Sequence, residues 1–188
     1  MEAAQMVRCA HAVMRAMTDD LQQTKSVEPV FVLLHEYGCD FVRFDPSLFN
    51  SALGKAAVAR TLCQRASDTQ AAGAVIGIDG YAFIPDIEAI ATANDRLVRA
   101  AAASGVNALV RSGLGCKSEA IAVALQTNEF HFLLQQLYAR DSGDIVFGDL
   151  LTIDSREFVG LPVITTGLFS IFPLESGCGP RSQISRNQ

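Results

Sequence analysis

A near-continuous apolar run in the middle of the chain sets the strongest limit on the fold. Gly73-Ala74-Val75-Ile76-Gly77-Ile78 carries no polar side chain. A strand of this kind is buried on both faces, so the run predicts a central strand of a sheet. The Asp79-Gly80 pair that follows is typical of a turn, and Tyr81 to Ile84 would then either extend the strand or return beside it.

Three segments carry apolar side chains at the three- or four-residue spacing of an amphipathic helix, namely residues 2–25, 48–67 and 87–104. The stripe of the first helix is rich in methionine and alanine, and it consists of Met6, Ala10, Val13, Met17 and Leu21. Such a stripe suits packing against a sheet or against a second copy of the chain. Asp86 is placed to cap the third helix, and Ser104-Gly105 to end it.

The other strands are predicted from short apolar stretches that turn residues separate. Strands at 30–34 and 39–44 would form a hairpin about Tyr37-Gly38. After residue 118 the turn signals recur regularly, which favours a meander; a helix in 119–139 remains the alternative. The meander strands are predicted at 119–126, 130–139 and 145–153, with a short strand at 107–110 and one edge strand within 159–172.

This order of elements predicts an α+β fold, with a mixed, mostly antiparallel sheet and about three helices packed on one face of it. A chain of 188 residues can bury about 70% of its unfolded surface, so it can form a core without disulfides or metals. We expect a single globular domain over residues 1–172 and a disordered C-terminal tail over 173–188. With 49% hydrophobic residues, the composition excludes a chain that is disordered throughout.

Charge and targeting signals exclude several classes of partner. The net charge is −5, and the arginines are mixed with acidic residues, so we expect no nucleic-acid partner. No apolar run approaches the ~20 residues of a membrane span. The N-terminal residues do not resemble a signal peptide, and the five cysteines are odd in number and widely spaced. These features predict a cytoplasmic protein without structural disulfides, in which Cys9 and Cys63 are small buried side chains.

Two segments resemble ligand-binding motifs and depart from them at required positions. The stretch from Arg111 to Ser118 is Gly-rich and ends in Lys-Ser, but Cys116 separates the last glycine from the lysine of a phosphate-binding loop. His35-Glu36 matches the start of a zinc-protease motif, whose second histidine is replaced by Cys39. We therefore predict no metal ion and no cofactor.

Four residues are the weak candidates for catalysis. Asp79 follows the predicted central strand, and Tyr81 has the same side-chain parity, so an acid–tyrosine pair there would suit proton transfer. His35 and Glu36 end the first predicted strand and add an imidazole and a second carboxylate. An ordinary Asp-Gly turn is the simpler interpretation of Asp79.

The chain has 12 Arg and 3 Lys and is rich in alanine, which indicates GC-rich coding and a bacterial or phage source. Its strand pattern at residues 74–81 and 119–123 resembles small domains of bacteria and their phages, a likeness that implies no activity. We expect a non-enzymatic binding or regulatory role through protein–protein contacts, by a partner or by self-association through the first helix. The alternative is a small-molecule enzyme with its site near the ends of the central strands.

Overall fold

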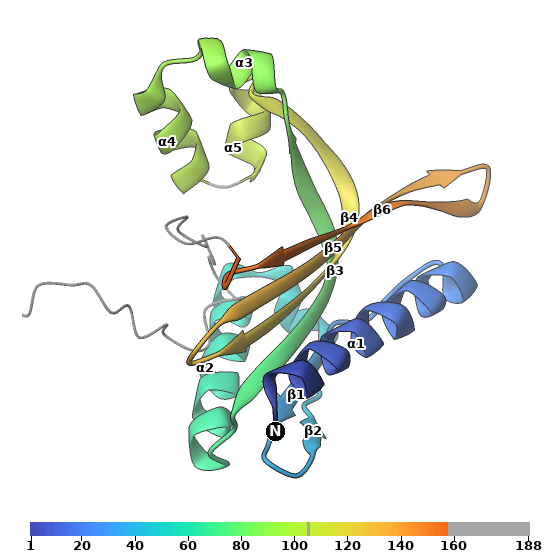
Figure 1. Ribbon diagram of the computed structural model, residues 1–188. Coiled ribbons are helices and arrows are strands. Elements are labelled where there is room, and N and C mark those ends of the chain that lie inside the picture. Colours follow the sequence, from blue (N-terminus) through green and yellow to red (C-terminus); the bar gives the residue numbers. More distant parts are fainter. Residues whose placement is uncertain (105, 158–188) are drawn as a thin grey trace, which may run out of the picture.

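The computed structural model describes residues 1–104 and 106–157, which form one six-stranded antiparallel sheet with five α-helices (Figure 1). The helices are α1 (Ala3–Thr24), α2 (Ala52–Asp68), α3 (Ile87–Thr92), α4 (Asp95–Ala103) and α5 (Val106–Arg111), with a 3₁₀ helix, η1, over Pro46–Asn50. The strands are β1 (Val30–Leu34), β2 (Cys39–Phe41), β3 (Gly73–Pro85), β4 (Gly115–Thr127), β5 (His131–Asp141) and β6 (Asp144–Asp154). This confirms the α+β class and the meander, and the helical alternative for 119–139 is wrong.

The strand order is β2-β1-β3-β4-β5-β6, so the apolar run at 73–78 lies in an inner strand as predicted. The turn predicted at Asp79-Gly80 is wrong, because β3 continues through it. Asp79 lies opposite Ile121 and Gly80 opposite Ala120, in a ladder that reaches Pro85 opposite Gly115. The backbone groups of residues 79–85 are paired along β4, and this pairing overrides the local turn preference.

One core lies between α1 and the sheet. The buried stripe of α1 is Met6, Ala10, Met14, Met17 and Leu21. It packs on inward-facing side chains of β1, β3, β4 and β5, which include Val32, Val75, Ile121, Val123 and Leu134. A reciprocal pair of hydrogen bonds between Glu2 and Gln5 fixes the start of the helix. The predicted apolar stripe is therefore confirmed. Its central buried residue is Met14, whereas the sequence pattern had predicted Val13.

A second core lies on the opposite face of the sheet, so the expectation that all helices share one face is wrong. Neighbouring strand residues point to opposite faces, and Phe31 and Leu33 of β1 pack against α2 while Val32 and Leu34 pack against α1. Leu62 is one of the α2 side chains that face this core, together with Val58 and Ala66. Its neighbour Cys63, predicted to be buried, is exposed for this reason.

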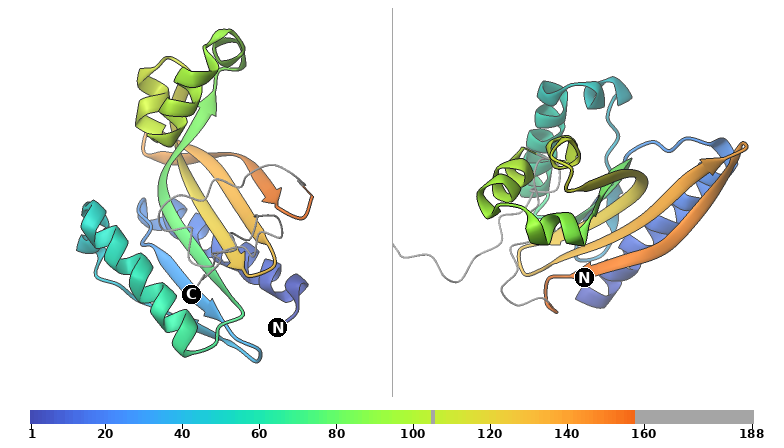
Figure 2. Two further views of the ribbon diagram at one scale, coloured as in Figure 1. Left: turned by 90° about the vertical axis from the view of Figure 1, so that its left-hand side faces the viewer. Right: turned by 90° about the horizontal axis from the view of Figure 1, so that it is seen from above.

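The far ends of β3 and β4 carry α3, α4 and α5 away from both cores (Figures 1 and 2). We call residues 82–104 and 106–118 the arm. The predicted helix 87–104 is broken in the arm because Ala93 is extended and the Asn94 side chain accepts a hydrogen bond from the Arg96 amide, which starts α4. Asp86 caps α3 as predicted, whereas the strand expected at 107–110 is part of α5.

The predicted edge strand within 159–172, the tail from 173 and Cys178 lie outside the described residues. Among the residues that the structure does describe, no helix combines the length and the apolar character needed to cross a membrane.

Candidate functional site

Asp79 forms the most closely paired polar contact among the predicted catalytic residues, with a tyrosine other than the expected one. The Tyr138 hydroxyl donates to Asp79 Oδ1 at 2.7 Å. The two side chains come from β3 and β5 and lie on the α1 face of the sheet, because Asp79 pairs with Ile121 and Tyr138 with Glu119 along β4. Tyr138 is only 4% exposed.

Arg140 and Glu119 extend this pair into a chain of four side chains, which we call the Tyr138 cluster. Arg140 Nε donates to Glu119 Oε1 at 3.3 Å, and Arg140 Nη2 lies 3.5 Å from the Tyr138 hydroxyl. The same guanidinium donates through Nη1 to the carbonyl of Lys25, the residue that ends α1 in a left-handed conformation. A cation there also complements the negative end of the helix dipole. The cluster therefore fastens the C-terminal end of α1 to the sheet.

The surroundings of Tyr138 keep its phenol protonated at neutral pH. Burial raises the pKa of the Tyr138 phenol well above its usual value, and the hydrogen bond and negative charge of Asp79 raise it further. A general acid or base works best when its pKa lies near the working pH. The phenol is instead held in its neutral, donating form. The Tyr138–Asp79 hydrogen bond links β5 to β3, and the catalytic role of Asp79 stays a prediction.

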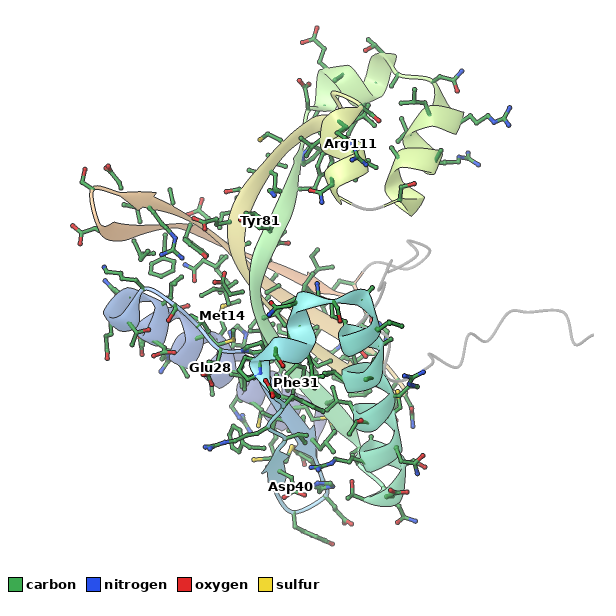
Figure 3. The ribbon with its side chains drawn as sticks, turned by 180° about the vertical axis from the view of Figure 1, so that it is seen from behind. Met14, Glu28, Phe31, Asp40, Tyr81 and Arg111 are labelled. Atoms are coloured by element: carbon green, nitrogen blue, oxygen red, sulfur yellow. The ribbon has the colours of Figure 1, made fainter. Side chains whose placement is uncertain are left out.

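Tyr81 lies beside the cluster, and it is Tyr138 that donates the hydrogen bond to Asp79. Tyr81 faces Glu119 across the β3–β4 ladder and remains 59% exposed. The Lys117 ammonium lies 3.7 Å from the centre of the Tyr81 ring, a cation–π contact. In Figure 3 Tyr81 marks the stretch of β3 between the cores and the helices of the arm.

His35 and Glu36 lie at the other end of the sheet, so the four predicted residues do not form one site. Leu34 pairs with Gly73, six residues before Asp79, which at ~3.3 Å per residue is about 20 Å away along β3. His35 Nε2 lies 3.0 Å from Asp40 Oδ2 within the β1–β2 hairpin. Figure 3 places Asp40 at the end of the molecule opposite the arm.

The Gly-rich segment before β4 has the wrong order of elements for a phosphate-binding loop. That loop leads from a strand into a helix, whereas here α5 leads into β4. Leu114 is buried, and its carbonyl accepts a hydrogen bond from the Asp86 amide. Gly115 is required because a Cβ atom there would collide with the Ile84 carbonyl. Over residues 1–104 and 106–157, no group of three His, Cys, Asp or Glu side chains is placed to hold a metal ion.

Sequence reasoning missed Tyr138, Arg140 and Glu119, although one signal pointed to them. Once a hairpin turn is placed after Thr127, counting outward residue by residue brings Glu119 opposite Tyr138. The contact with Asp79 depends on β3 continuing through Asp79-Gly80, which the sequence allowed only as one of two alternatives.

The comparisons with known proteins add no identification, because no family model, curated protein or solved structure matches the chain.

Proposed function

We propose that this protein has a non-enzymatic binding or regulatory role, and that it works through protein–protein contacts made by the arm. The sequence suggested self-association through the apolar stripe of α1. That stripe is buried within the chain's own core, from Met6 to Leu21. We therefore assign the contact surface to the arm instead.

The observation that carries the proposal is the apolar surface of the arm. Ile87 is 73% exposed, and Leu97 and Ile84 are 49% and 37% exposed. None of the described arm residues belongs to either core cluster. Three exposed apolar side chains on one projecting element support a contact surface there, because apolar patches in water mark interaction sites.

Few hydrophobic side chains are buried within the arm itself. Ala82, Ala101 and Leu114 are its only described hydrophobic residues that are almost fully buried. A segment with so few buried apolar contacts is held weakly and gains stability when a partner covers it. This property fits a recognition element better than a scaffold.

The test compares the wild-type chain with arm variants in native mass spectrometry of the protein purified from its source. Ile87→Asp and Leu97→Asp each place a charge on the exposed arm surface without touching either core. Leu53→Asp is the matched control, because Leu53 is 83% exposed and lies in α2, outside the arm.

We expect the wild type and the Leu53 variant to carry the same bound protein, and both arm variants to lose it. Circular dichroism confirms that the variants remain folded. The proposal is wrong if the arm variants retain the bound protein, or if the wild type carries only a small molecule that the arm variants also carry.

A further inference from the structure

Two cysteines from different elements lie on the same side of the sheet near its β2 edge. Cys39 pairs with Leu34 in the β1–β2 ladder, and residues opposite each other in a ladder point to the same face. Leu34 belongs to the core that α1 covers, so Cys39 points to the α1 face. Cys9 lies in α1 and packs against the same core.

A surface cavity of about 530 Å³ opens between the two elements. Cys9, Arg8 and Gln5 line it from α1, and Tyr37 and Gly38 line it from the β1–β2 turn directly before Cys39. The thiols also interact electrostatically. Burial raises the pKa of the Cys9 thiol, a negative charge at Cys39 raises it further, and the Arg8 guanidinium lowers it.

We propose that Cys9 and Cys39 form a reversible disulfide beside this cavity, which links α1 to the β1–β2 hairpin. Hydroperoxides, with hydrogen peroxide as the simplest, are the oxidants of the proposed reaction. This proposal does not depend on the function of the arm.

The two thiols have different roles in the reaction. Cys39 is exposed, so its thiolate attacks one peroxide oxygen and the O–O bond breaks, giving a sulfenic acid and, after protonation, one water. The sulfur of half-buried Cys9 then attacks the Cys39 sulfur. The S–S bond forms, the S–O bond breaks, and a second water leaves with the Cys9 proton. The two thiols lose two electrons in total, and one hydrogen peroxide is reduced to two waters; an organic hydroperoxide gives one alcohol and one water instead.

The position of the hairpin at the edge of the sheet favours the adjustment that bond formation requires. A disulfide needs Cα atoms within about 7 Å of each other. β2 is an edge strand of three residues, all exposed, and it pairs with β1 alone. Gly38 has no neighbouring atom within 4 Å of the position a Cβ would take, so the turn before Cys39 has space to move.

The test uses the full chain in a background where Cys63, Cys116 and Cys178 are each replaced by serine. After oxidation by hydrogen peroxide and blocking of remaining thiols, we expect the intact mass to fall by the two hydrogens lost. Peptide mapping should then join Cys9 to Cys39, and a thiol reductant should reverse the change. The additional Cys9→Ser variant should instead stop at the sulfenic acid of Cys39, which a sulfenic-acid probe detects.

Three results would overturn the proposal. One is a chain that keeps both thiols after peroxide treatment while circular dichroism shows it folded. Another is oxidation of Cys39 in the presence of Cys9 without the cross-link. The third is a cross-link that forms only between two chains, which appears as a doubled mass.

Discussion

At the scale of single residues, Tyr138 and Arg140 of β5 together join this strand to β3 and to the end of α1. Tyr138 donates to Asp79 on β3, while Arg140 beside it on β5 holds the end of α1 through the Lys25 carbonyl. A hydrogen bond to a charged acceptor contributes more than one between neutral groups. The Tyr138 cluster therefore stabilises the fold in two ways. Its hydrogen bonds involve charged groups, and they connect β5 to β3 and to α1.

The raised pKa of Tyr138 makes stability depend on pH at the alkaline end. The unfolded chain loses this proton near the ordinary tyrosine value of about 10, while the folded chain keeps it to higher pH. The contribution is therefore complete below pH ~10 and is lost as pH rises further. We expect Tyr138→Phe to cost about 1 kcal/mol at pH 7 and less at pH 11. Urea unfolding at both values measures this, and an equal cost at both would contradict it.

Asp154 makes stability depend on pH in the opposite direction, because its contribution is lost as the pH falls. Arg156 donates to both of its carboxylate oxygens and its guanidinium lies over the Phe130 ring. This hydrogen bonding lowers the pKa of Asp154. The contribution is therefore complete above the ordinary aspartate value, about 4, and is lost as pH falls through the lowered pKa.

We expect Arg156→Gln to destabilise the protein by about 1–3 kcal/mol at pH 7, because it leaves the nearly buried Asp154 carboxylate without its cation. The difference from the wild type should shrink as the pH falls below 4. Denaturant unfolding from pH 7 to pH 3 measures it, and a difference that grew on acidification would contradict the assignment.

At the scale of elements, the start of α2 shows local packing overriding helix propensity. Gly54 lies in the first turn, where its amide donates to the Ser51 hydroxyl. An exposed helical glycine usually gains ~1 kcal/mol when it becomes alanine. Here the added Cβ would meet the backbone of Leu48 in η1, which cannot move aside as a flexible side chain would.

Gly54→Ala is therefore expected to lower the thermal midpoint and destabilise the protein by about 1–3 kcal/mol. Gly80→Ala is the matched control, because nothing lies within 4 Å of the position that its Cβ would take. Thermal unfolding of both variants compares them. A midpoint for Gly54→Ala that equalled or exceeded that of Gly80→Ala would show that η1 is free to move.

Helices and strands with a strong hydrophobic periodicity were predictable from the sequence, whereas the points at which an element breaks or continues were not. The long apolar period of α1 and the regular turns of the meander identified those segments. The break at Ala93-Asn94 was missed because the apolar pattern on either side is continuous and only the Asn94 cap marks it. The alternative in which Tyr81 to Ile84 extend the strand is confirmed, but the sequence could not favour it over a turn, because β4, which pairs with β3 there, lies far along the chain.

Of the candidate site, only Asp79 was both predicted and found in a polar cluster. Tyr81 has the expected side-chain parity, but its ring contacts the Lys117 ammonium and not Asp79. His35 and Glu36 were proposed as catalytic residues only because of their side-chain types. The register of β1 against β3 places them far from Asp79 and Tyr81. Parity along one strand can be read from sequence, but contacts between strands require the register, which the sequence of one strand does not contain.

At the scale of the whole molecule, the sheet divides the chain into two cores and an arm. The cores share β1 and β3, whose alternating side chains enter one or the other. The described arm residues belong to neither core cluster, and the ladder of β3 and β4 connects the arm to the rest of the sheet (Figure 2). The arm helices should therefore be removable without loss of the cores.

The register of β3 against β4 shows where the arm helices can be removed. Pro85 and Gly115 lie opposite each other at the last pair of the β3–β4 ladder, so a two-residue Asn-Gly turn can join them in place of residues 86–114. We expect the shortened chain to unfold cooperatively, with a midpoint within about 4 °C of the wild type. Leu62→Ala is the comparison, because this side chain is 1% exposed in the α2 core and its loss should cost about 2–5 kcal/mol. Circular dichroism melting measures all three proteins. A shortened chain that melted below Leu62→Ala, or without cooperativity, would show that the arm helices belong to the unit that folds.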